Sequence, residues 1–271
     1  MHKFQGVSDT LFIPLAGRAY VSRRFPEYFY DAKAIELEPM IPGDSIQKNS
    51  PEYTMIAPAA RYYNLDRMTD AFIGKHGTCN IVNLGCGLDT SYFRIDCRGA
   101  TFYEVDFPEV IAVRKRVLGE SAREILLAAD IFSPEWAEKM DRTRPTLLIA
   151  SGVFQYCYEK EILDFIARVR EMFKEAELVF DATGRIGIRF ADYYVRRTGN
   201  TSAAMHFYIE SGLSFAEKAG VVLVEQRAFF TDALRILGGK LKLFSRLSMI
   251  IADRFHMSML VHLRLRKKGD C

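Results

Sequence analysis

The sequence has few cysteines and no long apolar run. Its five cysteines are scattered among 271 residues, and no two have the C-x2-C spacing of a metal site. We therefore expect neither a disulfide framework nor a bound metal, and a reducing cytoplasm fits this cysteine usage. No apolar run approaches the ~18–20 residues of a membrane span. The short run at residues 11–15 contains Pro14 and lacks the cleavage site of a signal peptide, so we expect no membrane partner.

An excess of charge of one sign is also missing. Thirty-seven Lys and Arg residues face 34 Asp and Glu residues, which leaves a formal net charge of +3. This balance argues against a nucleic-acid partner. The hydrophobic share of 49% and the charged share of 26% are those of an ordinary folded domain and exclude wholesale disorder.

Short apolar runs alternate with longer amphipathic stretches from residue 79 onward. The predicted strands are residues 81–84, 101–105, 125–129, 146–150, 178–181, 221–225 and 257–264. The predicted helices are residues 108–118, 134–140 (after a Ser133 cap), 160–173 and 207–218, with further helical spacing over 234–253. This alternation predicts an open α/β sheet with helical crossovers.

Residues 1–78 precede the first predicted strand and have a helical pattern. We expect them to form an N-terminal cap over the carboxyl edge of the sheet, with residues 79–271 as the core domain. Two insertions in that core, at about 185–206 and 231–256, are predicted to form a substrate lobe.

A glycine-containing turn follows the first predicted strand directly. Gly85 and Gly87 flank Cys86 there, and glycine lets a backbone turn tightly and approach a ligand closely. Asp106 ends the next strand 21 positions after Gly85, close to the ~20-residue spacing at which a carboxylate binds ribose hydroxyls. The segment therefore predicts a nucleoside site.

Two ligand classes compete for this turn. A dinucleotide fingerprint needs a third glycine at position 90, where this chain has Thr90. The turn thus favours S-adenosylmethionine, which has no pyrophosphate, over NAD. An NAD-dependent oxidoreductase and a non-catalytic nucleoside-binding protein stay open as alternatives.

Three blocks of sequence resemble the leucine carboxyl methyltransferase family. They are residues 83–90 (NLGCGLDT), 103–108 (YEVDFP) and 145–150 (PTLLIA), and the resemblance extends over about residues 10–180. Within the family, the chain is most similar to bacterial polyketide carboxyl O-methyltransferases of the tetracenomycin type. The resemblance implies a class I, Rossmann-like methyltransferase fold with a seven-stranded sheet whose last strand is antiparallel. It also implies S-adenosylmethionine as cofactor, with S-adenosylhomocysteine as product.

Arg61 stands out in the predicted cap. It shares one helical stripe with Leu65, Met68 and Phe72, in a slot where the pattern expects an apolar side chain. A guanidinium is suited to bidentate capture of a carboxylate. The family's arginine for the methionyl carboxylate of the cofactor aligns at this position.

The resemblance assigns further positions around the cofactor. Gly85 and Gly87 would pass under its methionyl part, Asp106 would bind the ribose, and Asp130 with Ile131 would contact the adenine. Ser151 stands where the family usually has a glutamate, so a carboxylate facing the cofactor's amino group is missing there and a non-catalytic binding protein remains conceivable. The expected cofactor-binding residues are therefore Arg61, Gly85, Gly87, Asp106, Asp130, Ile131 and Ser151.

Four residues are candidates for the substrate side. Arg18 and Tyr20 lie in the cap, where residues 10–19 resemble the polyketide enzymes, and a guanidinium could hold an acidic substrate. Tyr156 matches the family's tyrosine near the point of methyl transfer, although it could equally be a core residue. His206, in a Tyr- and Met-rich stretch, is a candidate base.

The choice of acceptor depends on whether a base is available. A carboxylate is already ionised at pH 7, whereas a phenol with a pKa of ~10 needs a base. The scarcity of plausible bases favours an O-methyltransferase that acts on a carboxylate of a small, polyketide-like acid. Methylation of a phenolic hydroxyl, or of a protein C-terminal carboxylate, is the alternative.

Overall fold

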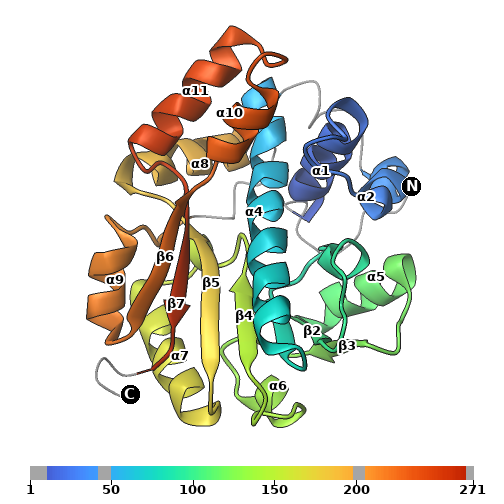
Figure 1. Cartoon of the computed structure of the whole chain (residues 1–271), viewed down its shortest axis with the longest axis vertical. Helices are drawn as coiled ribbons and strands as arrows, with labels where there is room; N and C mark the ends of the chain where they lie inside the picture. The colour runs from blue at the N-terminus through green and yellow to red at the C-terminus, as the bar shows by residue number, and fades with distance from the viewer. Residues whose placement is uncertain (1–10, 42–49, 198–204, 267–271) are drawn as a thin grey trace.

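The computed structural model describes residues 11–41, 50–197 and 205–266. Within these residues seven strands form one sheet in the order β3-β2-β1-β4-β5-β7-β6 (Figure 1). Their bounds are β1 Asn80–Leu84, β2 Thr101–Asp106, β3 Glu124–Ala128, β4 Thr146–Ala150, β5 Ala176–Ala182, β6 Val222–Ala228 and β7 Met259–Arg264. Strands β1 to β5 are parallel, and β7 is antiparallel to β5 and β6. The predicted fold class is confirmed.

The central strands are buried on both faces, which explains their continuous apolar runs. All residues of β1 and β4 are buried. Successive side chains of a strand point to opposite faces, so Ile81 packs into the core on one side of the sheet and Val82 into the core on the other. Strand β3 is partly exposed because it lies at the edge of the sheet.

Helices cover both faces of this sheet. On one face lie α6 (Glu135–Glu138), α7 (Glu159–Met172) and α9 (Gly212–Ala219), with Trp136, Phe165 and Phe215 in the core. On the other face lies α4 (Glu52–His76), with Ile56 and Ile73 buried, and α10 (Thr231–Leu237) and α11 (Leu243–Arg254) add buried residues to the same core. The two cores lie on opposite faces of the sheet, as expected for a three-layer α/β domain.

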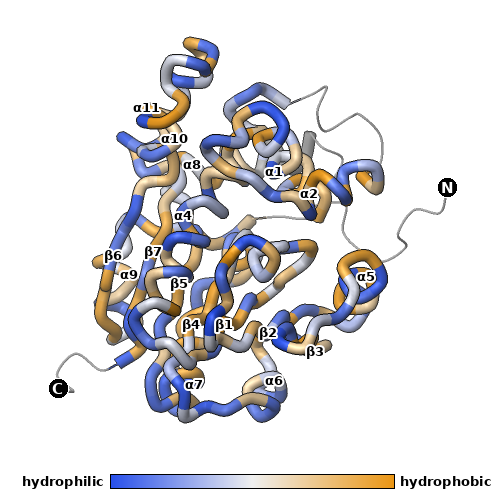
Figure 2. The backbone as a smooth tube through the Cα atoms, turned by 45° about the vertical axis from the view of Figure 1, so that its right-hand side comes forward, coloured by the Kyte–Doolittle hydropathy of each residue, from blue (hydrophilic) through white to orange (hydrophobic). Residues whose placement is uncertain are grey.

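The N-terminal helices pack beside the edge of the sheet where its parallel strands end. Residues of α1 (Phe12–Arg24) and α2 (Ala32–Leu37) form a third core with α5 (Pro108–Leu118), which includes Leu15, Leu37 and Val110. Both views place α1, α2, α10, α11 and α8 (Arg185–Arg197) beyond the carboxyl ends of the strands (Figures 1 and 2). The division into a cap (1–78) and a core (79–271) with a substrate lobe stays a prediction, and residues 198–204 of that lobe lie outside the described residues.

The remaining described elements are three short 3-10 helices. They are η2 Glu38–Met40, η3 Ser91–Phe93 and η4 Phe154–Tyr156, and η4 directly follows the end of β4.

Three predicted helices differ from the structure. The helix expected over 207–218 begins only at Gly212, because the backbone amides of His206 and Phe207 donate to Gln155 O and that of Ile209 donates to Thr183 O. The helix expected over 134–140 is confined to α6, with Pro134 rather than Ser133 at its N-cap.

The helical pattern over 234–253 forms two helices rather than one continuous stripe. Helix α10 ends at Leu237 and α11 begins at Leu243, so the two glycines at 238 and 239 fall between them. Leu237 is buried, but Phe244 and Leu247 are 69% and 50% exposed. Within α11 the regularly spaced residues therefore face solvent, and the residues that meet the core are Met249 and Ala252. Within the described ranges, no helix has both the length and the apolar character that crossing a bilayer requires.

Candidate functional site

The glycine turn follows β1 at the carboxyl edge of the sheet. Gly85 and Gly87 have φ angles of +63° and +49°, which disfavour residues with a side chain. The amides of Gly85 and Cys86 both donate to Val105 O, at 2.8 and 3.1 Å, so the turn is fixed to the end of β2. A Cβ atom on Gly85 would lie 2.6 Å from Val153 Cγ2, so glycine is also required for space.

Asp106 completes the turn from the end of β2. Its Oδ2 accepts a hydrogen bond from Gly87 N at 2.8 Å, and its Oδ1 accepts one from Phe107 N at 2.8 Å. Burial raises the pKa of this carboxyl, while the two backbone hydrogen bonds oppose the change. A carboxylate has about four lone-pair sites, so Asp106 keeps capacity for ligand hydroxyls. The predicted pairing of the glycine turn with Asp106 is thus present as a direct contact.

Asp130 and Ile131 follow β3 at the same edge. The Asp130 side chain is exposed, and its Oδ1 accepts a hydrogen bond from Phe132 N at 2.9 Å. Ile131 is half-buried, and its carbonyl accepts a hydrogen bond from Trp136 Nε1 at 2.9 Å. The backbone of this segment is therefore held in place, while the Asp130 carboxylate is open to solvent.

Arg61 reaches the edge from α4 and meets β4 and β5 there. Its Nη1 lies 3.1 Å from Asp181 Oδ2, and Asp181 Oδ1 accepts a hydrogen bond from Gly152 N at 2.5 Å. Burial alone would lower the pKa of Arg61, but the Asp181 carboxylate holds it above its ordinary value. Arg61 Nε is buried and has no hydrogen-bond partner among the described residues. An unpaired buried cationic donor is costly, and this makes Arg61 Nε a candidate donor to an anionic ligand.

Gly152 lies directly against Arg61. It has a φ angle of +74°, and a Cβ atom on it would be 2.8 Å from Arg61 Nη1. Ser151, half-buried beside it, directly follows β4 at the position assigned to the cofactor. The sequence analysis missed Asp181 and Gly152, although an acid at the end of the fifth strand occupies the same kind of position as Asp106 and Asp130.

Arg18 lies in a buried charge cluster rather than at an open surface. Its side chain is 1% exposed, and its Nη1 lies 2.8 Å from Asp31 Oδ2 while its Nη2 donates to Leu88 O at 2.7 Å. Thr90, just after the glycine turn, hydrogen-bonds to both Arg18 and Asp31. Arg94 also pairs with Asp31, at 2.9 Å. The guanidinium predicted to hold an acidic substrate is thus already bound by the protein, and it connects α1 to the glycine turn.

The same cluster extends toward Arg61 through one tyrosine ring. The guanidinium carbons of Arg18, Arg61 and Arg94 lie 4.8, 5.3 and 5.3 Å from the centre of the Tyr62 ring. Arg94 forms a bidentate pair with Asp66, at 2.8 and 2.9 Å. The arginine expected at the substrate and the arginine expected at the cofactor therefore share one packed neighbour.

The other predicted substrate residues are spread along the rim. Tyr20 lies on α1, half-buried, and burial raises its pKa. Tyr156 ends η4, half-buried beside the end of β4. His206 is exposed, and its ring stacks on Tyr158 with the centroids 4.6 Å apart.

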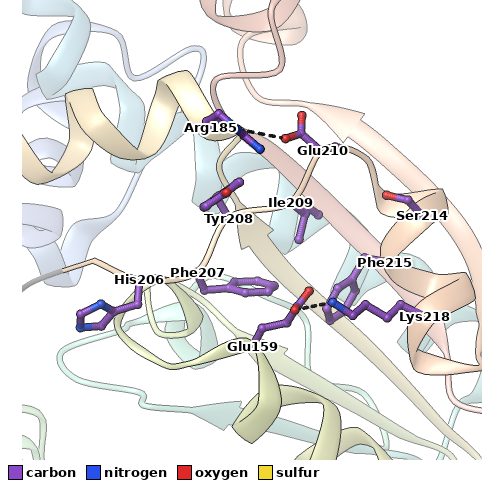
Figure 3. A pocket seen from close by; sticks show the side chains of 10 residues that line it. All are labelled: Glu159, Arg185, His206, Phe207, Tyr208, Ile209, Glu210, Ser214, Phe215 and Lys218. Atoms are coloured by element: carbon purple, nitrogen blue, oxygen red, sulfur yellow. Dashed lines mark hydrogen bonds and ion pairs between the residues drawn. The ribbon is translucent and has the colours of Figure 1, made fainter.

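His206 also borders a hollow of about 390 Å³ between α7, α8 and α9. Figure 3 shows two ion pairs across this hollow, Arg185 with Glu210 and Lys218 with Glu159, and His206 turned away from both. The charged groups of the hollow already neutralise one another, so the hollow itself offers no unpaired charge to a ligand among the residues that the structure describes.

The sequence is similar to those of several known proteins. The model of the leucine carboxyl methyltransferase family matches residues 11–170. The tetracenomycin polyketide synthesis O-methyltransferase TcmP of Streptomyces glaucescens is 30% identical over 202 residues, which are 73% of this chain and 75% of that protein. An S-adenosyl-L-methionine-dependent methyltransferase of Gibberella zeae is 26% identical over 153 residues, 52% of this chain and 51% of that one.

A solved structure with the same fold is that of magnesium protoporphyrin IX methyltransferase from Synechocystis with bound S-adenosylhomocysteine. It has a TM-score of 0.51 and 12% identity, and the match covers 92% of this chain and 99% of that chain. The residues matched by the family include Arg61, the glycine turn, Asp106 and Ser151.

Proposed function

Because the chain belongs to the leucine carboxyl methyltransferase family and is an S-adenosylmethionine-dependent methyltransferase, we propose that it methylates a carboxylate of a small, polyketide-like acid. The family is named for carboxyl methylation, and TcmP is named for O-methylation in polyketide synthesis. Both names support an oxygen acceptor. Features at the carboxyl edge of the sheet support a proposal for where the cofactor and the acceptor are held.

The residues at the carboxyl edge fit S-adenosylmethionine. The observation that carries this placement is the buried Nε of Arg61, which has no partner within the described part of the chain and offers a donor to the carboxylate of the methionyl part. Asp106, with lone pairs to spare, suits the ribose hydroxyls. Gly85 and Gly87 would let the turn pass close to the ligand between these two ends, and Asp130 with Ile131 would contact the adenine.

When bound, the cofactor supplies the methyl group and the leaving group of an in-line displacement. The protein's own contribution is to align the acceptor and to exclude water. Val153 packs against Gly85, and Phe154 behind it is fully buried, so apolar side chains line this part of the edge. Tyr156 at the end of η4 is the proposed neighbour of the transferred group.

A carboxylate acceptor suits the groups at this edge better than a phenol does. Asp106 and Asp181 each already accept two polar contacts from the protein, so neither is a free acceptor for the proton of a phenol. A carboxylate substrate is already anionic at neutral pH and needs no base. His206, exposed beside Tyr158, is the base to test if the acceptor is a phenol.

The lability of the product separates the two acceptors. Label transferred from the methyl group of the cofactor should be released as methanol in mild alkali, as from an ester, and the rate between about pH 6 and 9 should not follow ionisation of the acceptor. The variant His206→Ala should keep most of the activity. Alkali-stable label together with loss of activity in His206→Ala would overturn the carboxylate acceptor in favour of a phenolic one.

The two ends of the cofactor can be tested separately by calorimetry. Arg61→Ala should weaken binding of S-adenosylhomocysteine roughly 10- to 150-fold while leaving adenosine nearly unchanged, because adenosine lacks the carboxylate. Asp106→Asn should weaken both ligands. If Arg61→Ala weakens adenosine as much as Asp106→Asn does, the two residues do not bind opposite ends.

A further inference from the structure

Asp181 is the acidic partner of Arg61 at the carboxyl edge, and the methyl-transfer chemistry described above does not use it. It lies near the end of β5, and its side chain is 12% exposed. One carboxylate oxygen faces Arg61 Nη1 and the other accepts the amide hydrogen of Gly152. Asp181 thus connects three elements that are distant in sequence: α4, β5 and the segment after β4.

The contacts leave both partners with unused capacity. Arg61 uses Nη1 for Asp181 and keeps its buried Nε unpaired among the described residues. Asp181 accepts one hydrogen bond on each oxygen, and an ionised carboxylate can accept about four. The edge therefore presents a cation and an anion side by side, each able to make one more contact.

This arrangement matches the charge distribution of an α-amino acid. In such a group an ammonium and a carboxylate are attached to the same carbon atom, so a paired anion and cation can each bind the opposite charge. A lone guanidinium would select the carboxylate but would repel the ammonium. The Asp181 carboxylate removes that repulsion and adds a charge-assisted acceptor.

We propose that Asp181 accepts a hydrogen bond from the α-ammonium group of S-adenosylmethionine and, through the same side chain, positions Arg61 and Gly152. This inference rests on the proposed function, because it places the methionyl part of the cofactor at Arg61. Gly152 is part of the arrangement: a side chain at this position would displace the Arg61 guanidinium from Asp181. The acid for the cofactor's amino group then comes from β5, beside Ser151, rather than from position 151 itself.

The test compares S-adenosylhomocysteine with its analogue in which hydrogen replaces the α-amino group, and with adenosine, by calorimetry. Asp181→Asn keeps the shape of the side chain and an acceptor for Gly152 N, and Asp164→Asn, at an exposed position on α7, is the matched control. We expect Asp181→Asn to bind S-adenosylhomocysteine 10- to 100-fold more weakly and to lose clearly less affinity for the deaminated analogue, which keeps only the contact through Arg61. Adenosine should bind within about twofold of the unchanged protein, and Asp164→Asn should change nothing.

Two results would overturn the proposal. One is an equal loss for S-adenosylhomocysteine and its deaminated analogue in Asp181→Asn, which would reduce Asp181 to a structural counterion of Arg61. The other is equal affinity of the unchanged protein for these two ligands, a measurement that needs no variant to fold. If the unchanged protein binds neither adenosine nor S-adenosylhomocysteine, the proposed cofactor site itself fails, and this outcome is distinct from the two above.

Discussion

Replacing Arg18 with alanine should destabilise the protein far more than replacing its neighbour Arg23. Arg18 is 1% exposed and contacts Asp31, Thr90 and the Leu88 carbonyl, so its loss leaves the buried Asp31 carboxylate with only part of its compensation. Breaking a buried ion pair in this way costs ~3–5 kcal/mol. With an unfolding entropy of ~2.1 cal/mol/K per residue over 271 residues, the melting temperature should fall by ~5–9 °C.

Arg23 on the same helix is the matched control. Its side chain is 57% exposed and pairs with Glu38, and such surface pairs contribute ~0–1 kcal/mol. Arg23→Ala should therefore shift the melting temperature by less than ~2 °C in the same scanning calorimetry experiment. If Arg18→Ala melts within ~2 °C of the unchanged protein and raises the Michaelis constant for the acceptor instead, then Arg18 contacts the substrate and does not hold α1 to the glycine turn.

Three further results are expected. Burial alone would raise the pKa of Glu177, but the hydrogen bond from His262 and the nearby cations hold this pKa at about 2, against an ordinary value of 4.5. The ionised Glu177 therefore stabilises the fold above pH ~4.5, and this stabilisation is lost as the pH falls toward 2. In urea titrations Glu177→Gln should therefore cost ~3 kcal/mol at pH 7 and nothing near pH 2; a constant difference would contradict this. Gly152→Ala should lower the free energy of unfolding by ~1–2 kcal/mol, since the φ angle is +74°. It should also weaken the binding of S-adenosylhomocysteine more than that of adenosine, and equal losses of affinity would show that this glycine does not act through Arg61. Burial raises the pKa of the Cys86 thiol well above its usual value, so at pH 8 it should react with a disulfide reagent only after unfolding, and fast labelling of the native protein would refute its burial.

The positions of the central strands were predictable because their residues are buried on both faces. A continuous apolar run such as residues 146–150 has few alternatives to a central strand, and the structure places β4 over the same residues. The expected helix over 207–218 was wrong at its start for the opposite reason. Backbone bonds to Gln155 and Thr183 hold residues 206–209, and no pattern within that segment indicates partners so distant in sequence.

One part of the candidate site was likewise predictable from the sequence, and another part was not. The contact between Gly87 and Asp106 follows from two adjacent strands ending at one edge, which sequence spacing can predict. The burial of Arg18 could not be predicted, because it depends on Asp31, Thr90 and Arg94, brought together by α2, the glycine turn and η3. The sequence alone does not tell whether an arginine in the cap faces solvent, binds a substrate or lies buried, because that depends on where its counterions are.

The attachment of α1 to the glycine turn also has a kinetic consequence. A swing of α1 away from the sheet would break the hydrogen bonds of Arg18 to Thr90 and to Leu88 O. At ~3 kcal/mol or more for the two together, this makes such an opening at least ~100-fold rarer. Product release at every turnover would then be slow if it depended on that helix. We expect ligands to enter and leave at the opposite rim. There residues 205–210 cross the ends of β4 and β5, and His206 and Tyr208 are exposed. The residence time of the spent cofactor would thus be set by a surface segment, while the floor of the site stays rigid.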